Sequence, residues 1–299
     1  MAVFHSEYIK VRHADVHIHV SVSGAAANTP DAKPTIVFLH YWGGSTRTWA
    51  QVAARVTDAG YRTASIDFRG WGLSVGPADK DAYSIALLAD DIEDVLVKLH
   101  PSGGPVVLVG LSMGAKVAQV VANRIATAAA SGNYLSVSAA VLAGPAPATP
   151  FQLPPDMREQ QLHAYDAAGT ASFVAQNVLT VSFRGDSNSS RLPEFLVDDM
   201  LRGNPPARAA WPAYAMAEDV TATSLGSLAT PPPVLVLAAE KDVVEPPERV
   251  KSGVLASIAG AKLELIAGSG HLSPIDAQEA VAAAIVRFVG AVAETPSTK

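Results

Sequence analysis

The chain has 299 residues, of which 49% are hydrophobic and 17% charged, so it can bury a large core and does not have the composition of a disordered chain. Its net charge of −6 at pH 7 excludes the basic surface that nucleic-acid binding needs, and we expect no nucleic acid as a partner. The chain contains no cysteine, which excludes disulfides, thiolate zinc sites and a cysteine nucleophile.

Two segments bear on the location of the protein. The N-terminal stretch from Met1 to Tyr8 lacks a basic region followed by an apolar core, so we expect no signal peptide. The apolar stretch from Glu279 to Val292 is interrupted by Arg287 and is too short to cross a bilayer. We therefore expect a cytoplasmic protein without a membrane span, and the sequence leaves open whether it is a monomer or a dimer.

In chain order, apolar periodicity first predicts two strands, at residues 7–12 and 15–22, joined by a short turn. Further strands are predicted at residues 35–39, 62–66, 105–109, 139–143, 234–238 and 262–266. Helices are predicted at residues 46–58, 84–100, 113–130, 247–259 and 275–292. Buried apolar runs that alternate with helices imply an α/β protein with a mostly parallel eight-stranded sheet and helices on both faces.

One stretch interrupts this alternation after the sixth strand. About 90 residues separate Gly144 from Val234 without a strand pattern, which is far longer than an ordinary connection. Proline is frequent where the stretch begins and ends. Helical patterns within it cover residues 156–168, 171–181, 193–202 and 207–218. We expect a helical insertion here.

The segment from Pro105 to Ala118 contains the most informative motif. A β-branched run ends at Gly110, Ser112 follows, and a helical pattern begins at once. Gly110-Leu-Ser112-Met-Gly114 fits the Gly-x-Ser-x-Gly nucleophile elbow in its strand-turn-helix context. Such a serine is held in a strained backbone conformation, and side chains at either glycine would collide with neighbouring elements. The helix that follows points free N–H groups toward an oxyanion.

Any glycine-rich turn can carry a serine by chance, so a serine hydrolase also needs a base and an acid. His271, in a glycine-rich loop after the last predicted strand, is expected at the same sheet edge as Ser112. Asp242 follows the preceding strand and is favoured as the acid that orients His271. Glu240 and Glu245 are competing acids in the same loop. The oxyanion needs two N–H donors, one from Met113 and one from the loop of residues 40–45.

With these motifs the chain resembles the α/β-hydrolase superfamily over nearly its whole length. The order serine, aspartate, histidine is also the order of that family. The resemblance implies that the N–H of Trp42 is the second oxyanion donor and that His40 is structural. The family usually has glycine where this chain has Tyr41, which we therefore expect near the site. The motifs that carry the resemblance are His40-x-x-Gly43-Gly44, Asp67-x-x-Gly70-x-Gly72-x-Ser74, Gly110–Gly114 and Gly270-His271 with Ser273-Pro274.

The resemblance further implies that residues 147–223 form a helical cap over the site, with residues 1–146 and 224–299 as the core. The cap has few convergent charges, which indicates an apolar acyl or alcohol part of the substrate. We expect most of its large apolar side chains to belong to the core of the cap itself. The candidate pocket residues are Tyr41, Tyr165, Trp211 and Tyr214, with Phe151, Met157, Phe173, Phe183, Phe195, Met200 and Met216 as further cap candidates.

The leading hypothesis is a serine esterase, with lactones possible, that acts on a relatively apolar small molecule through an acyl-serine intermediate. Haloalkane dehalogenases and epoxide hydrolases of this fold use an aspartate nucleophile, and Ser112 argues against both. The alternatives are a carbon–carbon bond hydrolase or cofactor-free perhydrolase with the same triad, and a non-catalytic receptor for a small molecule. No residue cluster has metal-ligand spacing and no glycine turn has a nucleotide-binding signature, so we expect neither metal nor cofactor.

Overall fold

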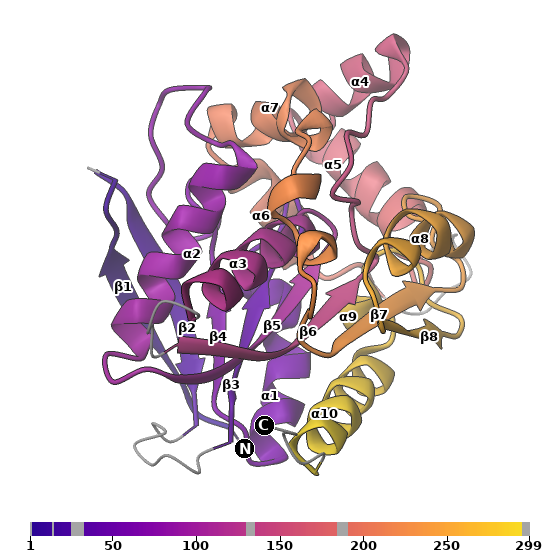
Figure 1. Ribbon diagram of the computed structural model, residues 1–299. Helices are drawn as coiled ribbons and strands as arrows, with labels where there is room; N and C mark the ends of the chain where they lie inside the picture. Colours follow the sequence, from indigo (N-terminus) through magenta and orange to yellow (C-terminus); the bar gives the residue numbers. More distant parts are fainter. Residues whose placement is uncertain (1, 14, 25–32, 130–134, 184–190, 295–299) are drawn as a thin grey trace.

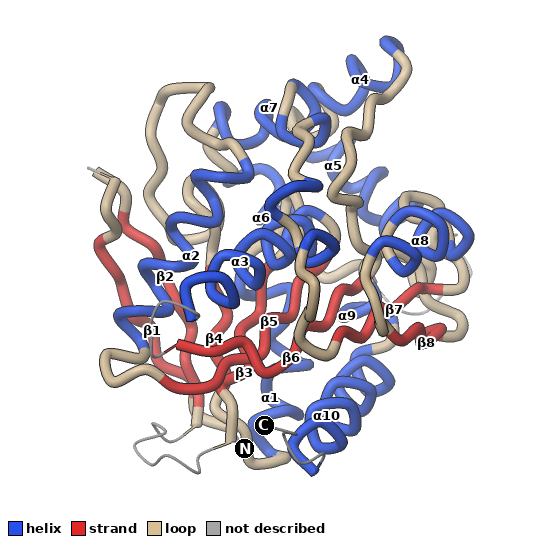
Figure 2. The backbone as a smooth tube through the Cα atoms, in the orientation of Figure 1, coloured by secondary structure: helices blue, strands red, loops and turns tan. Residues whose placement is uncertain are grey.

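The structure is a computed structural model that describes residues 2–13, 15–24, 33–129, 135–183 and 191–294. A twisted sheet forms its centre, with helices on both sides (Figure 1), and the strands make one continuous layer (Figure 2). The strands of the described residues lie in the order β1-β2-β4-β3-β5-β6-β7-β8. Their bounds are β1 Phe4–Lys10, β2 His17–Ser23, β3 Thr35–Leu39, β4 Thr63–Ile66, β5 Gly104–Leu111, β6 Leu135–Ala143, β7 Val234–Ala239 and β8 Lys262–Ile266.

The sheet is mostly parallel, as predicted. β2 pairs antiparallel with β1 and β4, whereas all the other neighbours pair in parallel. Parallel strands must be covered on both faces, which favours unbroken apolar runs. β3 and β7 have such runs, and every residue in them is buried.

β3 and β8 have the predicted bounds, and the other strands differ from the prediction by one to four residues at one or both ends. β1 begins at Phe4 and β2 runs to Ser23, because the hairpin pairs these two residues across polar positions that periodicity does not identify as strand. β6 begins at Leu135 rather than at residue 139. It extends along the first half of β5 through a register shift between Val106 and Val107. Pairing partners therefore determine where these strands end.

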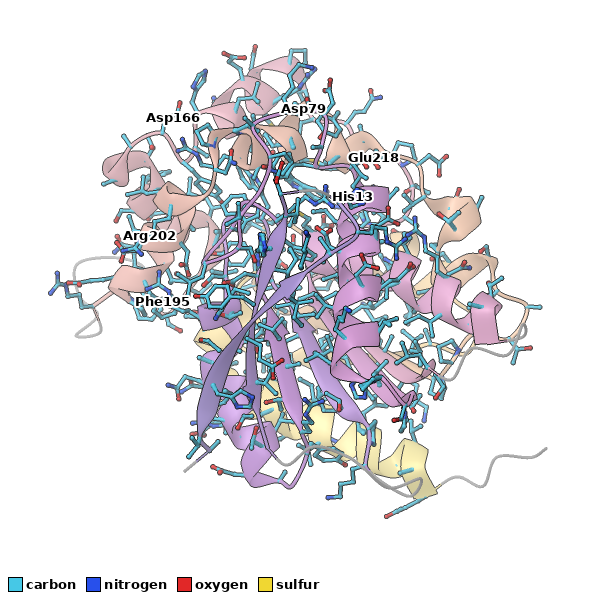
Figure 3. All side chains as sticks on the ribbon, turned by 90° about the vertical axis from the view of Figure 1, so that its left-hand side faces the viewer. His13, Asp79, Asp166, Phe195, Arg202 and Glu218 are labelled. Carbon is cyan, nitrogen blue, oxygen red and sulfur yellow. The ribbon has the colours of Figure 1, made fainter. Side chains whose placement is uncertain are left out.

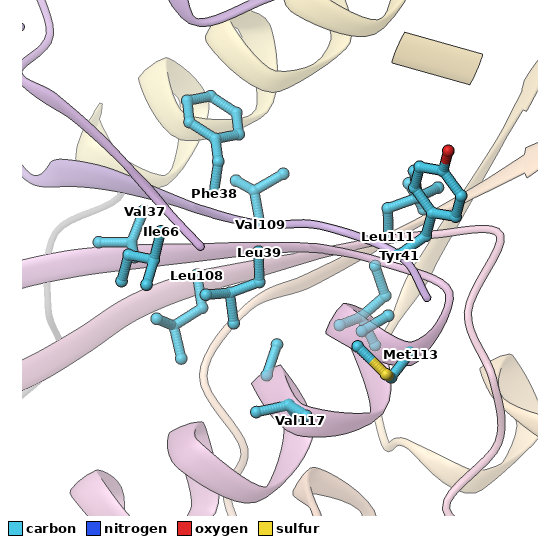
Figure 4. Close-up of a cluster of buried hydrophobic side chains, with 14 of the residues drawn as sticks. Val37, Phe38, Leu39, Tyr41, Ile66, Leu108, Val109, Leu111, Met113 and Val117 are labelled. Atoms are coloured by element: carbon cyan, nitrogen blue, oxygen red, sulfur yellow. The ribbon is translucent and has the colours of Figure 1, made fainter. Parts of the chain in front are cut away.

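Helices cover each face of the sheet. α2 (Ile85–Leu99) and α3 (Met113–Ala129) pack on one face, and α1 (Ala50–Asp58) and α10 (Gln278–Glu294) pack against each other on the opposite face (Figure 1). Figure 4 shows Leu39 and Leu108 pointing toward Val117 of α3, while Phe38 and Val109 point the other way. The strands at the centre of the sheet thus contribute to two apolar layers.

The predicted core helices differ from the structure in their bounds. Residues 46–58 form a 3-10 turn, Thr46–Trp49, followed by α1, the helix expected at 84–100 is α2, and the one expected at 275–292 divides into α9 (Ser273–Asp276) and α10. The helix expected at residues 247–259 is shorter: α8 (Pro247–Gly253) ends early and a 3-10 turn, Leu255–Ser257, follows. The last residue of the helix expected at 113–130, Ala130, lies outside the described residues.

Between β6 and β7 the described residues form helices and no strand, and they lie over the edge where the parallel strands end (Figure 1). We call residues 147–223 the insertion; Figure 3 shows it from the side of β1, with Asp166, Phe195 and Arg202 labelled. Its helices are shorter than predicted, and Pro212 lies in the last turn of α7. They are α4 (Pro155–Leu162), α5 (Ala168–Val174), α6 (Glu194–Arg202) and α7 (Pro205–Ala213), with a π turn at Ala175–Leu179 and a 3-10 turn at Ala215–Ala217.

No helix in the described part of the chain has the length and apolar character that crossing a bilayer requires.

Candidate active site

Ser112 lies in the tight turn between β5 and α3. Its φ of +55° is in the left-handed region, which a non-glycine residue adopts only where its surroundings impose it. The N–H of Ser112 donates to the carbonyl of Ala143 (3.0 Å), and its own carbonyl accepts from the N–H of Ala115 (3.0 Å). The strained conformation predicted for this serine is confirmed, and β6 and α3 hold it from both sides.

Gly110 and Gly114 leave no room for a side chain. A Cβ on Gly110 would lie 2.4 Å from the carbonyl oxygen of Gly114. A Cβ on Gly114 would lie 2.5 Å from the carbonyl oxygens of Leu39 and His40. Backbone atoms cannot move aside as side chains can, so both positions require glycine, as predicted. The two glycines let α3 begin directly beside Ser112.

Asp242 and His271 form a buried pair at the same edge of the sheet. His271 Nδ1 lies 2.8 Å from Asp242 Oδ2. Asp242 Oδ1 accepts from the N–H groups of Val244 (2.7 Å) and Glu245 (2.9 Å). Burial disfavours the charged ring, but the charge and hydrogen bond of Asp242 raise the pKa of His271 above its ordinary value. A proton held on Nδ1 by Asp242 leaves Nε2 free to act as a base.

Of the two competing acids, only Glu245 lies near this pair. Glu240 is exposed and accepts from the N–H of Gly268 (2.7 Å). Glu245 is buried, and burial raises its pKa to about 7 against the opposing charge of Arg249, whose Nε lies 3.5 Å from Glu245 Oε2. The charge of Glu245 also raises the pKa of His271. A second group that titrates near neutral pH therefore acts on the candidate base.

Ser112 and His271 line one cavity of about 610 Å³ between the sheet edge and the insertion. The structure shows no hydrogen bond between the Ser112 hydroxyl and the His271 ring, a contact that is often long before substrate binds. Among the described residues, no Asp, Glu, Lys or Arg lines this cavity. The wall is otherwise largely apolar, and the insertion supplies much of it, including Leu153, Met157, Tyr165, Phe173, Leu179 and Trp211.

The candidate pocket residues divide into two groups. Tyr41, Tyr165 and Trp211 line the cavity. Tyr214 does not, because α7 ends at Ala213 and the helical spacing that would place Tyr214 beside Trp211 is lost. Its hydroxyl instead accepts from the N–H of Tyr83 (3.1 Å) and donates to the carbonyl of Lys80 (2.8 Å). Of the further cap candidates Met157 and Phe173 line the cavity, whereas Phe151, Phe183, Phe195, Met200 and Met216 are not among its lining residues.

The loop after β3 makes a tight turn at the cavity wall. The N–H of Gly44 donates to the carbonyl of Tyr41 (3.0 Å), and Gly43 has a φ of +98°, which favours glycine. The hydrogen bond that closes this turn is donated by Gly44, so it does not engage the N–H of Trp42, the predicted oxyanion donor. His40 supports the turn: Nδ1 donates to the carbonyl of Tyr41 (2.7 Å) and Nε2 accepts from the N–H of Phe68 (3.0 Å). With both ring nitrogens engaged and its pKa lowered by burial, His40 holds the loop and is not available as a base.

Lys116, one turn after Ser112, was missed by the sequence analysis. Its side chain is buried, and Nζ donates to the carbonyls of Met216 (3.0 Å) and Glu218 (2.7 Å). Burial lowers the pKa of Lys116 to about 8. The helix that follows the candidate nucleophile thus holds the segment by which the insertion returns to the core. The signal for this contact is a single lysine in the apolar run Ala115-Lys116-Val117-Ala118.

A second Ser–His–Asp arrangement combines a serine of β1, a histidine of β2 and the aspartate that follows β4. Ser6 Oγ lies 3.0 Å from His19 Nε2, and His19 Nδ1 lies 2.8 Å from Asp67 Oδ2. A Cβ on Gly72 would lie 2.3 Å from the Asp67 carboxylate, which explains the glycine in the Asp67 motif. We call Ser6, His19 and Asp67 the outer set, and Ser112, Asp242 and His271 the inner set.

Within the part of the chain that the structure describes, no group of three or more His, Cys, Asp or Glu side chains could hold a metal ion.

The model of the alpha/beta hydrolase family matches residues 36–284. The chain belongs to this family. An epoxide hydrolase from Caballeronia sordidicola is 32% identical over 100 residues, which cover 33% of this chain and 28% of that protein. The chain spans about three tenths of the length of the curated relatives that it matches.

Solved structures are similar over nearly the whole chain. An esterase from Exiguobacterium antarcticum is 22% identical with a TM-score of 0.75, and the match covers 96% of this chain and 100% of that one. An enol-lactonase from Burkholderia xenovorans is 20% identical with a TM-score of 0.76, over 95% and 100% of the two chains. At this identity the likeness shows the fold.

Proposed function

We propose that the protein is a serine hydrolase that cleaves carboxylic esters, including lactones, of relatively apolar small molecules. The observation that carries this proposal is that Ser112 and His271 line one largely apolar cavity while Asp242 holds the far nitrogen of His271. These are the three groups that acyl transfer needs, and the contact of Asp242 with Nδ1 leaves Nε2 to accept a proton. Esterase and lactonase activity in proteins of the same fold agrees with the proposal.

In the proposed reaction, His271 Nε2 takes the proton of the Ser112 hydroxyl as Oγ attacks the ester carbonyl carbon. The N–H groups of Met113 and Trp42 stabilise the resulting oxyanion. The carbon–oxygen bond to the alcohol then breaks, and His271 gives its proton to the leaving oxygen. Water attacks the acyl-serine in the second half, with its proton passing to His271 and then to Ser112 Oγ.

The insertion would act as a cap that selects apolar substrates. Met157, Phe173 and Trp211 on the cavity wall support this role, as does the lack of lysine, arginine and carboxylate side chains among its described lining residues. A cap also excludes water, which strengthens the hydrogen bonds to the oxyanion. Preference for short charged esters over apolar esters in a substrate panel would contradict this part of the proposal.

Epoxide hydrolysis is the second candidate, because curated relatives carry that name. An aspartate nucleophile joins the epoxide carbon as an ester, which water can hydrolyse at the carbonyl carbon. Ser112 would instead join it as an ether, which has no carbonyl carbon for the oxyanion donors to act on. Ester hydrolysis is therefore the favoured activity. Conversion of an epoxide to a diol without ester turnover would favour epoxide hydrolysis instead.

The test combines a fluorophosphonate probe, read by intact mass, with hydrolysis of p-nitrophenyl esters from acetate to octanoate and of an aryl epoxide. We expect labelling and ester turnover in the wild type, loss of both in Ser112→Ala, and retention of both in Ser6→Ala. The two variants remove the same hydroxyl from the inner and the outer set. Folded wild-type protein that is neither labelled nor active on any ester would contradict the proposal and favour a receptor.

A further inference from the structure

The insertion holds the loop proposed to supply the second oxyanion donor. The hydroxyl of Tyr165 donates to the carbonyl of Trp42 (3.0 Å), and the two rings stack with their centroids 4.2 Å apart. A Cβ on Gly43 would lie 2.6 Å from the Tyr165 hydroxyl oxygen. Tyr165 therefore packs against the Trp42 ring and against Gly43, the residues on either side of the peptide bond that it binds. Only the absence of a side chain at Gly43 lets the Tyr165 ring lie this close.

Tyr165 is protonated at neutral pH, as tyrosine ordinarily is, and its burial makes ionisation still less favourable. Its side chain is only 2% exposed, and burial raises its pKa well above the ordinary value. Throughout the neutral pH range the Trp42 carbonyl therefore has a donor.

A second residue of the insertion closes this contact into a ring of hydrogen bonds. Trp42 Nε1 donates to the carbonyl of Arg208 in α7 (2.9 Å). The Arg208 guanidinium in turn donates to the carbonyl of Tyr165. Trp42 is thus held at its carbonyl and at its indole, so the residue cannot turn without breaking a hydrogen bond.

The same loop is attached to the insertion a few residues further on. Asp199 of α6 is buried and accepts from the hydroxyl of Ser45 (2.6 Å) and from Arg47 Nε (3.1 Å). The insertion therefore holds the loop after β3 at Trp42 and again at Ser45.

We propose that Tyr165 is a positioning residue: by holding the peptide group that follows Trp42 and stacking on its ring, it fixes the backbone at Trp42 and thereby the direction of its N–H toward the oxyanion. The inference rests on the proposed function, since it assigns Trp42 the role of oxyanion donor. It goes beyond a role for the insertion in substrate selection, because it makes the insertion part of the catalytic geometry. Charge on the substrate oxygen develops mainly in the transition state, so a misplaced donor lowers kcat and leaves KM nearly unchanged.

Tyr165→Phe tests the inference, because it keeps the ring and its stacking on Trp42 and removes only the donor. We expect kcat for a p-nitrophenyl ester to fall about tenfold, less than the roughly 100- to 1000-fold loss on removing an oxyanion donor outright. KM should stay within about twofold. Affinity for an aryl trifluoromethyl ketone, which forms an oxyanion on Ser112, should fall by the same factor as kcat/KM.

Tyr214→Phe is the matched control. It removes a hydroxyl of the same insertion that also donates to a main-chain carbonyl, that of Lys80, but Tyr214 does not line the cavity. We expect kcat and KM of this variant to equal those of the wild type. An equal loss of kcat in both variants would show a general loosening of the insertion and overturn the inference.

Amide hydrogen exchange gives a readout that does not depend on ester turnover. In Tyr165→Phe the amides of residues 41–44 should exchange faster than in Tyr214→Phe, while those of α10 stay unchanged. An unchanged kcat in Tyr165→Phe overturns the inference and leaves ester hydrolysis intact. If the wild type cleaves no ester, the proposed function fails and the inference about the oxyanion fails with it, and exchange alone then decides whether Tyr165 holds the turn.

Discussion

The inner and outer sets share their polar contacts and differ in their surroundings. In both, a histidine Nδ1 lies 2.8 Å from an aspartate oxygen, and His19 and His271 are both buried. The outer set also has a 3.0 Å contact between Ser6 Oγ and His19 Nε2, for which the structure shows no counterpart at Ser112. Judged by hydrogen bonds alone, the outer set would be the better triad.

The surroundings reverse that judgement. Ser6 lies exposed on β1, in a strand whose backbone pairs with β2. Ser112 has a left-handed backbone conformation, directly precedes α3 and lines a largely apolar cavity. Acyl transfer needs N–H donors near the new oxyanion and a site that excludes water. Ser112, unlike Ser6, lies at the start of a helix and lines a largely apolar cavity. A candidate nucleophile is therefore better recognised by its surroundings than by its histidine and aspartate.

The largest expected effect separates the two histidines. His271→Ala should lower ester hydrolysis by about ten-thousand-fold or more, because the serine loses its base. His19→Ala should keep kcat within about threefold but lose on the order of 2 kcal/mol of unfolding free energy, because the buried Asp67 loses a partner. Ester kinetics and urea denaturation measure the two effects. Retained hydrolysis in His271→Ala, or its loss in folded His19→Ala, would make the comparison wrong.

An intermediate effect is expected from the backbone beside Ser112. Gly114→Ala places a Cβ 2.5 Å from two carbonyl oxygens and should cost about 1–3 kcal/mol of stability. Displacement of α3 by even ~1 Å should lower kcat by about 100-fold. Gly290→Ala in α10 is the control, since a Cβ there meets nothing within 4 Å and should stabilise the helix by up to about 1 kcal/mol. Thermal unfolding and ester kinetics are the measurements, and a fully active Gly114→Ala would show that the close approach of α3 is unimportant.

The smallest effect is a shift in pH dependence. The reaction needs neutral His271, whose pKa lies above 6.5, so kcat/KM should fall with decreasing pH through a midpoint above 6.5. Glu245→Gln removes a negative charge that favours the protonated ring, so the pKa of His271 and the midpoint should both move down. Glu248→Gln, at an exposed carboxylate paired with Lys251, should leave the profile in place. A midpoint that rises in Glu245→Gln would contradict the assigned sign.

Features set by neighbouring residues or by strand order could be predicted from the sequence. Gly110 and Gly114 are required because backbone atoms of the same turn and of the adjacent strand leave no room for a Cβ. The motif alone is therefore enough to predict the tight turn. Asp242 and His271 follow consecutive parallel strands, whose carboxyl ends meet at one edge, and their 2.8 Å contact agrees with that order.

Contacts that depend on packing between distant segments could not be predicted. Tyr214 is a candidate only because the resemblance places a cap over the site. The sequence predicts a helix at residues 207–218, but α7 ends at Ala213, since periodicity gives the face of a helix and not the residue at which it ends. The outer set depends on the register of β1 against β2 and of β2 against β4. Tyr165 and Trp42 lie 123 residues apart, and nothing local in either segment identifies the other as its partner.

Lys116 also limits how the insertion of this protein can be replaced by that of another family member. An insertion of this kind is an obvious target for exchange between family members when a new substrate preference is wanted. Here the core supplies a buried ammonium group to two carbonyls of the segment that leaves the insertion. A grafted insertion with a different path at that point would leave the ammonium group buried without a partner, which is strongly destabilising. The unit to be exchanged is therefore the insertion together with α3.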